Sequence, residues 1–187
     1  MQNLILQKYH ADMELKYVDK DEDMSLFKAS LSVMENVDRD GDMIQKGAFD
    51  SWLSKGVSRI PMLWQHDKKM PMGYFENFKV EGNLLTADGV LLKKTTVGRD
   101  ADILLQNEAI KGVSIGYISK RWGLRRNKDM EDYDAIHTPA YGRDLKEIEL
   151  FEASIVTVPS NDQAMVLKSL SDTEANQLIL EYYTQNL

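Results

Sequence analysis

TVGRDADILLQNEAIKGVSIGY, residues 96–117, has two halves with different periodicities. The first half has apolar residues that recur on one face of a helix, and Thr96 stands where an N-cap would stand. The second half, GVSIGY, alternates in the way a strand does, with Ser114 at its centre. We therefore predict a helix over residues 96–110 that leads directly into a strand carrying this serine.

The order of these two elements excludes one common setting for a reactive serine. The GxSxG pattern of residues 112–116 is also found in the nucleophile elbow of α/β-hydrolases, but there the order is strand, turn, helix, with the acid and the histidine downstream. Here the helix comes first, so we exclude the elbow. On a strand, the glycines at 112 and 116 share the face of Ser114, which predicts that a substrate backbone can approach the hydroxyl.

The rest of the chain alternates mainly as strands. We expect strands within residues 4–18, 24–36, 60–66 and 146–158, a hairpin over 73–92 that turns at 81–83, and a short helix over 47–55. Residues 121–144 are charged and aperiodic, which predicts a loop. A capping box over 171–174 begins a final helix at about 172–186. The segment VDRDGD, residues 37–42, is predicted as a tight turn, because its glycine and its twelfth position do not fit a calcium loop.

Composition restricts the class of protein. With 187 residues, 43% hydrophobic content and 28% charged residues, we expect one soluble domain over residues 1–187. The absence of cysteine excludes disulfides, thiolate nucleophiles and cysteine-based metal sites. A net charge of −7 argues against nucleic acid or an anionic membrane as the main partner, and RWGLRRNK, residues 121–128, is predicted as a solvated loop. We expect no cofactor, no signal peptide and no membrane span.

A serine nucleophile requires a base, and His66 is the best candidate. The hydroxyl is activated when a neighbouring base takes its proton. His66 ends the apolar segment 60–66, and functional groups gather at strand ends, whereas His10 and His137 lie in polar, charged contexts. A structural histidine is the alternative interpretation for this position.

The base in turn works best beside a carboxylate, and Glu152 is the candidate for that role. It interrupts the apolar run LFEASIVTV, where a carboxylate needs a polar partner. Asp67 suits the role less, because adjacent residues of a strand point to opposite faces. Taken one at a time, Ser114 also fits a packed strand serine and Glu152 a surface glutamate on an edge strand. Together, His66, Ser114 and Glu152 form the predicted catalytic set.

Five segments, in this order and spacing, resemble the tailed-phage prohead (capsid maturation) protease family, whose members are serine proteases with a herpesvirus-assemblin-like fold. The segments are NVDRDGDMIQKGAF (36–49), PMLWQHD (61–67), GNLLTADGVLL (82–92), TVGRDADILLQNEAIKGVSIGY (96–117) and LFEASIVTVPSNDQA (150–164). The resemblance covers about residues 25–167. It implies an α+β fold with a mainly antiparallel β-barrel core and surrounding helices.

The same resemblance implies roles and partners. Ser114 becomes the nucleophile, His66 the general base and Glu152 the residue that orients the histidine. The enzyme would act in the host cytoplasm, inside the assembling procapsid, on the major capsid protein or its scaffold or delta region and on itself. Whether the chain forms a homodimer stays open. Backbone N–H groups would stabilise the oxyanion, or a water held by Arg121 or Arg143. Exposed self-cleavage positions are expected within 121–144 and after about residue 165.

Two other functions fit the same residues. The chain can be a scaffold-like capsid assembly protein that has the fold without activity, or an acyl hydrolase that uses the same three side chains on small esters. Loss of cleavage in Ser114→Ala separates the protease from the scaffold protein. Turnover of activated esters without cleavage of capsid peptides identifies the acyl hydrolase.

Overall fold

The computed structural model describes residues 18–19, 23–125 and 142–167, and these form nine strands and two helices. The strands are β1 (Val18–Asp19), β2 (Met24–Val33), β3 (Met43–Ile44), β4 (Arg59–Trp64), β5 (Asp67–Glu81), β6 (Leu84–Leu92), β7 (Gly112–Arg125), β8 (Gly142–Val156) and β9 (Met165–Leu167). The helices are α1 (Asp50–Leu53) and α2 (Thr96–Gln106).

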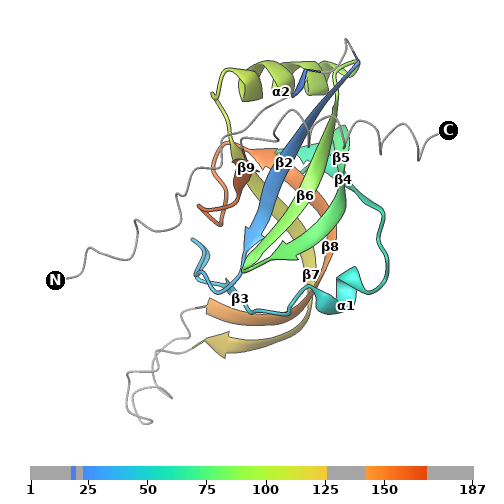
Figure 1. Cartoon of the computed structure of the whole chain (residues 1–187). Helices are drawn as coiled ribbons and strands as arrows, with labels where there is room; N and C mark the ends of the chain where they lie inside the picture. The colour runs from blue at the N-terminus through green and yellow to red at the C-terminus, as the bar shows by residue number, and fades with distance from the viewer. Residues whose placement is uncertain (1–17, 20–22, 126–141, 168–187) are drawn as a thin grey trace, which may run out of the picture.

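Seven of the strands close into a barrel. Their order is β2-β6-β5-β4-β8-β7-β9, and β9 pairs again with β2. Most neighbours are antiparallel, but β4 and β3 both run parallel to β8. Figure 1 shows α2 across one end of the barrel and β3 toward the other end. Because a closed barrel leaves no long sheet edge unpaired, the backbone groups of these strands are satisfied by their neighbours.

The barrel interior is filled by the alternate apolar residues of the strands. Phe27 of β2 and Phe75 of β5 are fully buried and meet edge to face, with ring centroids 6.0 Å apart. Gly89 of β6 makes room for this pair, because a Cβ at that position would lie 2.5 Å from the Phe27 ring. A glycine inside a strand thus serves close packing rather than flexibility.

The expected barrel is present, while the expected α+β class is only partly confirmed. The described residues are mainly β: the helix predicted over 47–55 is limited to Asp50–Leu53, and α2 ends at Gln106. Thr95 rather than Thr96 caps α2, through a bond from the backbone N–H of Gly98 to its hydroxyl oxygen at 2.9 Å. The hairpin formed by β5 and β6 is confirmed, with β5 beginning earlier than predicted.

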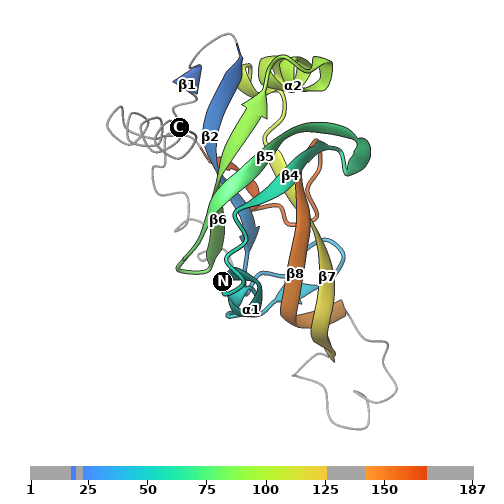
Figure 2. The ribbon, with the colours of Figure 1, turned by 90° about the vertical axis from the view of Figure 1, so that its right-hand side faces the viewer.

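The loop predicted over residues 121–144 is wrong at both of its ends. β7 continues to Arg125 and β8 begins at Gly142, and the two strands stay paired out to these residues. Their charged side chains lie on an exposed ribbon while the partner strand satisfies the backbone, so a polar composition did not exclude strand. Figure 2 shows this ribbon extending beyond the barrel. Residues 126–141, the predicted final helix and most of the strand predicted over 4–18 lie outside the described residues.

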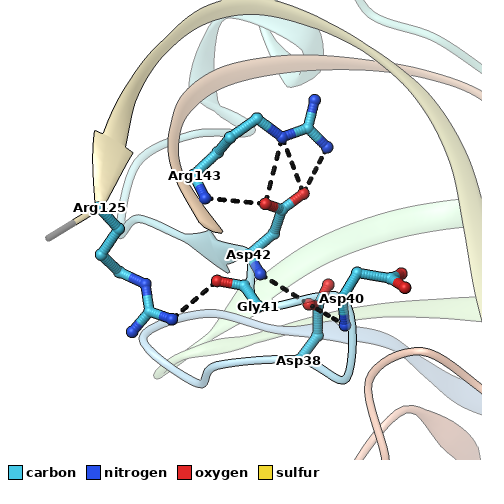
Figure 3. Close-up of polar contacts among 6 residues, drawn as sticks. All are labelled: Asp38, Asp40, Gly41, Asp42, Arg125 and Arg143. Carbon is cyan, nitrogen blue, oxygen red and sulfur yellow. Dashed lines mark hydrogen bonds and ion pairs between the residues drawn. The ribbon is translucent and has the colours of Figure 1, made fainter. Parts of the chain in front are cut away.

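The far part of this ribbon holds the turn of residues 37–42. Asp42 is buried and accepts hydrogen bonds from the backbone N–H and the guanidinium of Arg143, with Nε at 3.0 and 3.1 Å from its two oxygens. Arg125 donates to the carbonyl oxygen of Gly41 at 2.7 Å. Within the turn, the backbone N–H groups of Asp40 and Asp42 donate to Asp38 Oδ1 (Figure 3). The predicted tight turn is therefore confirmed, and hydrogen bonds from Arg125 and Arg143 hold it against the ribbon.

Arg143→Ala is expected to lower the free energy of unfolding by about 1.5–3 kcal/mol, because the buried Asp42 carboxylate loses the hydrogen bonds of its cationic partner. Arg121→Ala provides a matched control. Arg121 pairs with Glu147 at 3.7 Å on the exposed ribbon, and such surface pairs contribute about 0–1 kcal/mol. Urea unfolding of both variants measures the difference. Equal losses in the two variants would contradict a structural role for the Asp42 pair.

Candidate active site

His66 lies in the two-residue turn that joins β4 to β5. Gln65 and His66 both have positive φ, 52° and 60°, and the strands resume pairing at Trp64 and Asp67. Two consecutive residues with positive φ are the signature of a type I′ hairpin turn, which normally favours asparagine and glycine. Holding a glutamine and a histidine there costs energy, and such local strain is commonly found at functional sites.

Glu152 of β8 is buried, with 3% of its surface exposed, and its Oε1 lies 2.8 Å from His66 Nδ1. An ionised carboxylate only accepts hydrogen bonds, so Nδ1 carries the proton and Nε2 is left as the basic nitrogen of the neutral ring. This hydrogen bond is the main cause that raises the pKa of His66, partial burial opposes it, and the negative charge of Glu152 adds to the rise. The contact exists because β4 runs parallel beside β8, with Leu63 opposite Ser154.

Ser154 is a member of this site that the sequence analysis missed. Its hydroxyl donates to Glu152 Oε2 at 2.7 Å and accepts from the backbone N–H of His66 at 3.2 Å. Ser154 therefore connects the carboxylate to the turn that carries the imidazole. The signal was available, because residues two apart on a strand share one face and Ser154 follows Glu152 by two positions.

Ser114 lies on β7 directly opposite Ser154, and Gly116 lies opposite Glu152. Ser114 and His66 line one cavity of about 180 Å³, which we call the Ser114 cavity. Both residues are part of its wall, and no direct hydrogen bond joins their side chains. Catalytic hydrogen bonds of this kind are often long in the free enzyme and tighten when substrate binds. The three predicted residues are thus brought to one place: two in contact, and the third on the wall of the same cavity.

The glycines beside Ser114 have a different purpose from the one predicted. A Cβ at Gly116 would lie 2.0 Å from Glu152 Oε1, and a Cβ at Gly112 would lie 2.6 Å from the carbonyl oxygen of Val156. Both missing side chains therefore make room for atoms of β8 and its continuation, not for a substrate backbone. Gly116 in particular provides the space in which the Glu152 carboxylate sits.

The remaining candidates lie elsewhere. Asp67, which suited the role less, accepts from the backbone N–H of Lys69 at 2.9 Å, whereas the imidazole of His66 contacts Glu152. Among the described residues, neither Arg121 nor Arg143 is part of the wall of the Ser114 cavity. His10 and His137 are outside the described residues.

The described residues include no cluster of three or more His, Asp or Glu side chains arranged to hold a metal ion. None of the helices described there has the length and apolar character that a bilayer crossing requires.

Comparison with known proteins finds similarity in sequence and in structure. The prohead protease of Enterobacteria phage HK97 is 28% identical over 167 residues, which cover 87% of this chain and 68% of that protein. KSHV protease in complex with a hexapeptide phosphonate inhibitor is similar with a TM-score of 0.45 and 8% identity, over 88% of this chain and 79% of that one. Kaposi's sarcoma herpesvirus protease with an allosteric inhibitor has a TM-score of 0.42 and 7% identity, over 85% and 91%. The Caudovirus prohead serine protease family matches residues 11–178, nearly the whole chain, so this chain belongs to that family of serine proteases.

Proposed function

We propose that this serine protease uses Ser114 as nucleophile, His66 as general base and Glu152 as the residue that orients the histidine. The observation that supports this assignment best is the 2.8 Å contact between His66 Nδ1 and the buried Glu152 carboxylate, at the edge of the cavity that Ser114 lines. A buried carboxylate, a histidine and a serine in this relation are the components of a catalytic triad. The family favours this function over the inactive scaffold protein and the acyl hydrolase.

In the first step, Ser114 Oγ attacks the carbonyl carbon of the scissile peptide while His66 Nε2 takes the hydroxyl proton. The imidazolium that forms is stabilised by Glu152, which already raises the pKa of His66 in the free enzyme. The negative charge that develops on the carbonyl oxygen needs hydrogen-bond donors fixed in advance, and backbone N–H groups are the expected donors.

In the second step, His66 returns the proton to the departing amine as the carbon–nitrogen bond breaks, which leaves an acyl ester on Ser114. Water then attacks this ester while His66 again accepts a proton. Collapse of the second tetrahedral intermediate releases the new carboxyl terminus and restores the Ser114 hydroxyl. Glu152 holds the imidazole in the tautomer that both steps require.

We further propose that the substrate is the major capsid protein, through its scaffold or delta region, and that the chain also cuts itself. The site of action would be the interior of the assembling procapsid in the host cytoplasm. The whole chain, residues 1–187, would act as one protease domain, with its core in about residues 25–167. Self-cleavage is expected in segments that leave the barrel, where exposed backbone is most easily cut.

Co-expression of the chain with the capsid protein of the same phage tests this function. Intact masses are measured for both proteins, with wild-type enzyme and with Ser114→Ala. We expect a shortened capsid protein with wild type only. Identical, uncut masses with both enzymes would reject the protease assignment for this pair of proteins.

Ser154→Ala is expected to lower kcat/KM by about tenfold, because a buried hydrogen-bond donor to Glu152 and an acceptor for the His66 turn are both lost. Ser30→Ala is the matched control, since Ser30 is equally buried and its hydroxyl has no hydrogen-bond partner within the described residues. The pH profile of kcat/KM separates a positioning role from general destabilisation, because only the former also moves the His66 titration. Equal activity of the two variants would contradict a role for Ser154 in the site.

A further inference from the structure

The Ser114 cavity extends from the nucleophile to the turn of residues 37–42. One part of its wall is apolar and includes Leu31, Ile44 and Val113. The part contributed by the turn includes Asp38, Asp40 and Asp42. The three apolar residues are buried, whereas Asp38 is half-buried and Asp40 is exposed, so a side chain beside Ser114 can contact the apolar wall while its end reaches the carboxylates nearer the surface. The inference drawn from this arrangement rests on the proposed function, since it concerns the substrate of the same site.

The aspartates of the turn line the Ser114 cavity, whereas the arginines around the turn do not. Asp42 is neutralised by Arg143, as Figure 3 shows, and Arg125 is bound to the carbonyl oxygen of Gly41. Arg39 donates to the carbonyl oxygen of Pro159 at 2.9 Å. None of these three arginines belongs to the described wall of the cavity, whereas the aspartates do. The guanidinium groups are thus not part of the cavity wall, and the outer part of that wall is left with negative charge.

Asp38 and Asp40 supply that negative charge. Among the described residues, no lysine or arginine forms an ion pair with either carboxylate. Asp38 Oδ1 is occupied by two backbone N–H groups of the turn, at 3.0 and 2.8 Å. Figure 3 shows the Asp40 carboxylate extending away from the Asp42–Arg143 pair. Burial raises the pKa of Asp38, so its ionised form is poorly solvated and would gain from a cation.

Two further groups point to a ligand in this space. Ser32 lines the cavity, is 1% exposed, and its hydroxyl has no hydrogen-bond partner among the described residues. A buried hydroxyl without a partner costs free energy that a bound polar group would recover. The Tyr117 phenol also lines the cavity; burial is the main cause that raises its pKa, and the negative charges of Asp42, Asp38 and Asp40 add to the rise, against Arg143. The raised pKa of the Tyr117 phenol is therefore consistent with a negative electrostatic potential in the Ser114 cavity.

We propose that the Ser114 cavity binds a lysine or arginine side chain of the substrate, on the residue whose carbonyl Ser114 attacks. The apolar wall would contact the aliphatic stem, and Asp38 and Asp40 would be the specificity-determining acceptors of the cationic head. Ser32 and Tyr117 would complete its hydrogen bonds. Because the turn is held by Arg125 and Arg143, the two carboxylates are fixed before the substrate arrives, which favours selectivity.

The cleavage preference of the full chain tests this proposal. A library of unfolded peptides is treated with wild type and with Ser114→Ala, and the new termini are identified by mass spectrometry. Rates are then measured on matched peptides that carry Lys, Arg, Gln or Glu before the scissile bond. We expect cuts after Lys and Arg, with rates at least about tenfold above those for the Gln peptide, as charge recognition in a partly buried site implies.

The variants Asp38→Asn and Asp40→Asn remove one charge each while keeping an oxygen that can accept hydrogen bonds. Each is expected to lower the ratio of Lys to Gln cleavage, and Asp40→Lys should move the preference toward the Glu peptide. Asp100→Asn on α2, at the other end of the barrel, is the matched control and should keep the wild-type ratio. Thermal unfolding of each variant verifies that the turn is intact.

The outcomes separate this inference from the proposed function. Cuts that depend on Ser114 but show no excess of Lys or Arg on the acyl side would overturn the inference alone. The same holds for a Lys preference that Asp38→Asn and Asp40→Asn leave unchanged, or for basic residues found only after the scissile bond. Absence of any cut that depends on Ser114 would overturn both.

Discussion

Glu152→Gln is expected to lower kcat/KM by about a thousandfold to ten-thousandfold while the fold is retained. Glutamine has the shape of glutamate, but its amide N–H can donate to His66 Nδ1. That bond would place the ring proton on Nε2 and remove the base from the side that faces Ser114. The loss therefore arises from the wrong tautomer and from an imidazolium without its counter-charge.

The pH profile gives this prediction a second readout. As the proposed base, His66 must be neutral, so activity is expected to rise as pH increases through the pKa of His66. Glu152 raises this pKa above its ordinary value of 6.5, chiefly through the Nδ1 hydrogen bond. The acid limb of the wild-type profile should therefore lie above pH 6.5, and in Glu152→Gln it should move to lower pH because burial, which lowers the pKa, is no longer opposed.

Glu149→Gln is the matched control. Glu149 lies on the same strand, β8, and pairs with Lys55 and Lys120 at 3.0 and 2.9 Å on the exposed side of the ribbon. It should keep the wild-type activity and pH limb. Activity of Glu152→Gln within about tenfold of wild type would remove Glu152 from the proposed triad.

Gly116→Ala is expected to lower kcat/KM by about a hundredfold or more, although it adds a single methyl group. The new Cβ would lie 2.0 Å from Glu152 Oε1 and 2.7 Å from the carboxyl carbon, far inside contact distance. The carboxylate must therefore leave its position against His66 Nδ1. Misplacement of a catalytic group by about 1 Å is enough for a loss of this size.

Gly123→Ala is the control, because it adds the same methyl group to the same strand. Its nearest neighbour would be Lys146 Nζ at 3.7 Å, an ordinary contact with the end of a flexible side chain. Activity is measured beside Glu152→Ala and the double variant Gly116→Ala/Glu152→Ala. If Gly116 acts only through the carboxylate, the double variant should be no less active than Glu152→Ala alone. Near-normal activity of Gly116→Ala would contradict this account.

The local elements of the fold were predictable to the extent that their periodicity was clear. The hairpin of β5 and β6, the helix before Ser114 and the tight turn at residues 37–42 all follow from short patterns of apolar, glycine and turn residues. The outer halves of β7 and β8 were not predictable in this way. These halves pair with each other and pack little against the core. They therefore carry charged residues without an apolar alternation, as a loop does.

The sequence by itself predicted a set of residues for acyl-transfer chemistry, because Ser114, His66 and Glu152 each stand out within a short segment. Only the tertiary structure decided that Glu152 and His66, 86 positions apart, meet at 2.8 Å, and that Ser154 connects them. It also decided that Gly116 makes room for a carboxylate and that an acidic turn lines the same cavity as Ser114. The physical reason is that alternation with period two specifies which face a residue occupies, whereas strand order around a barrel specifies which faces meet.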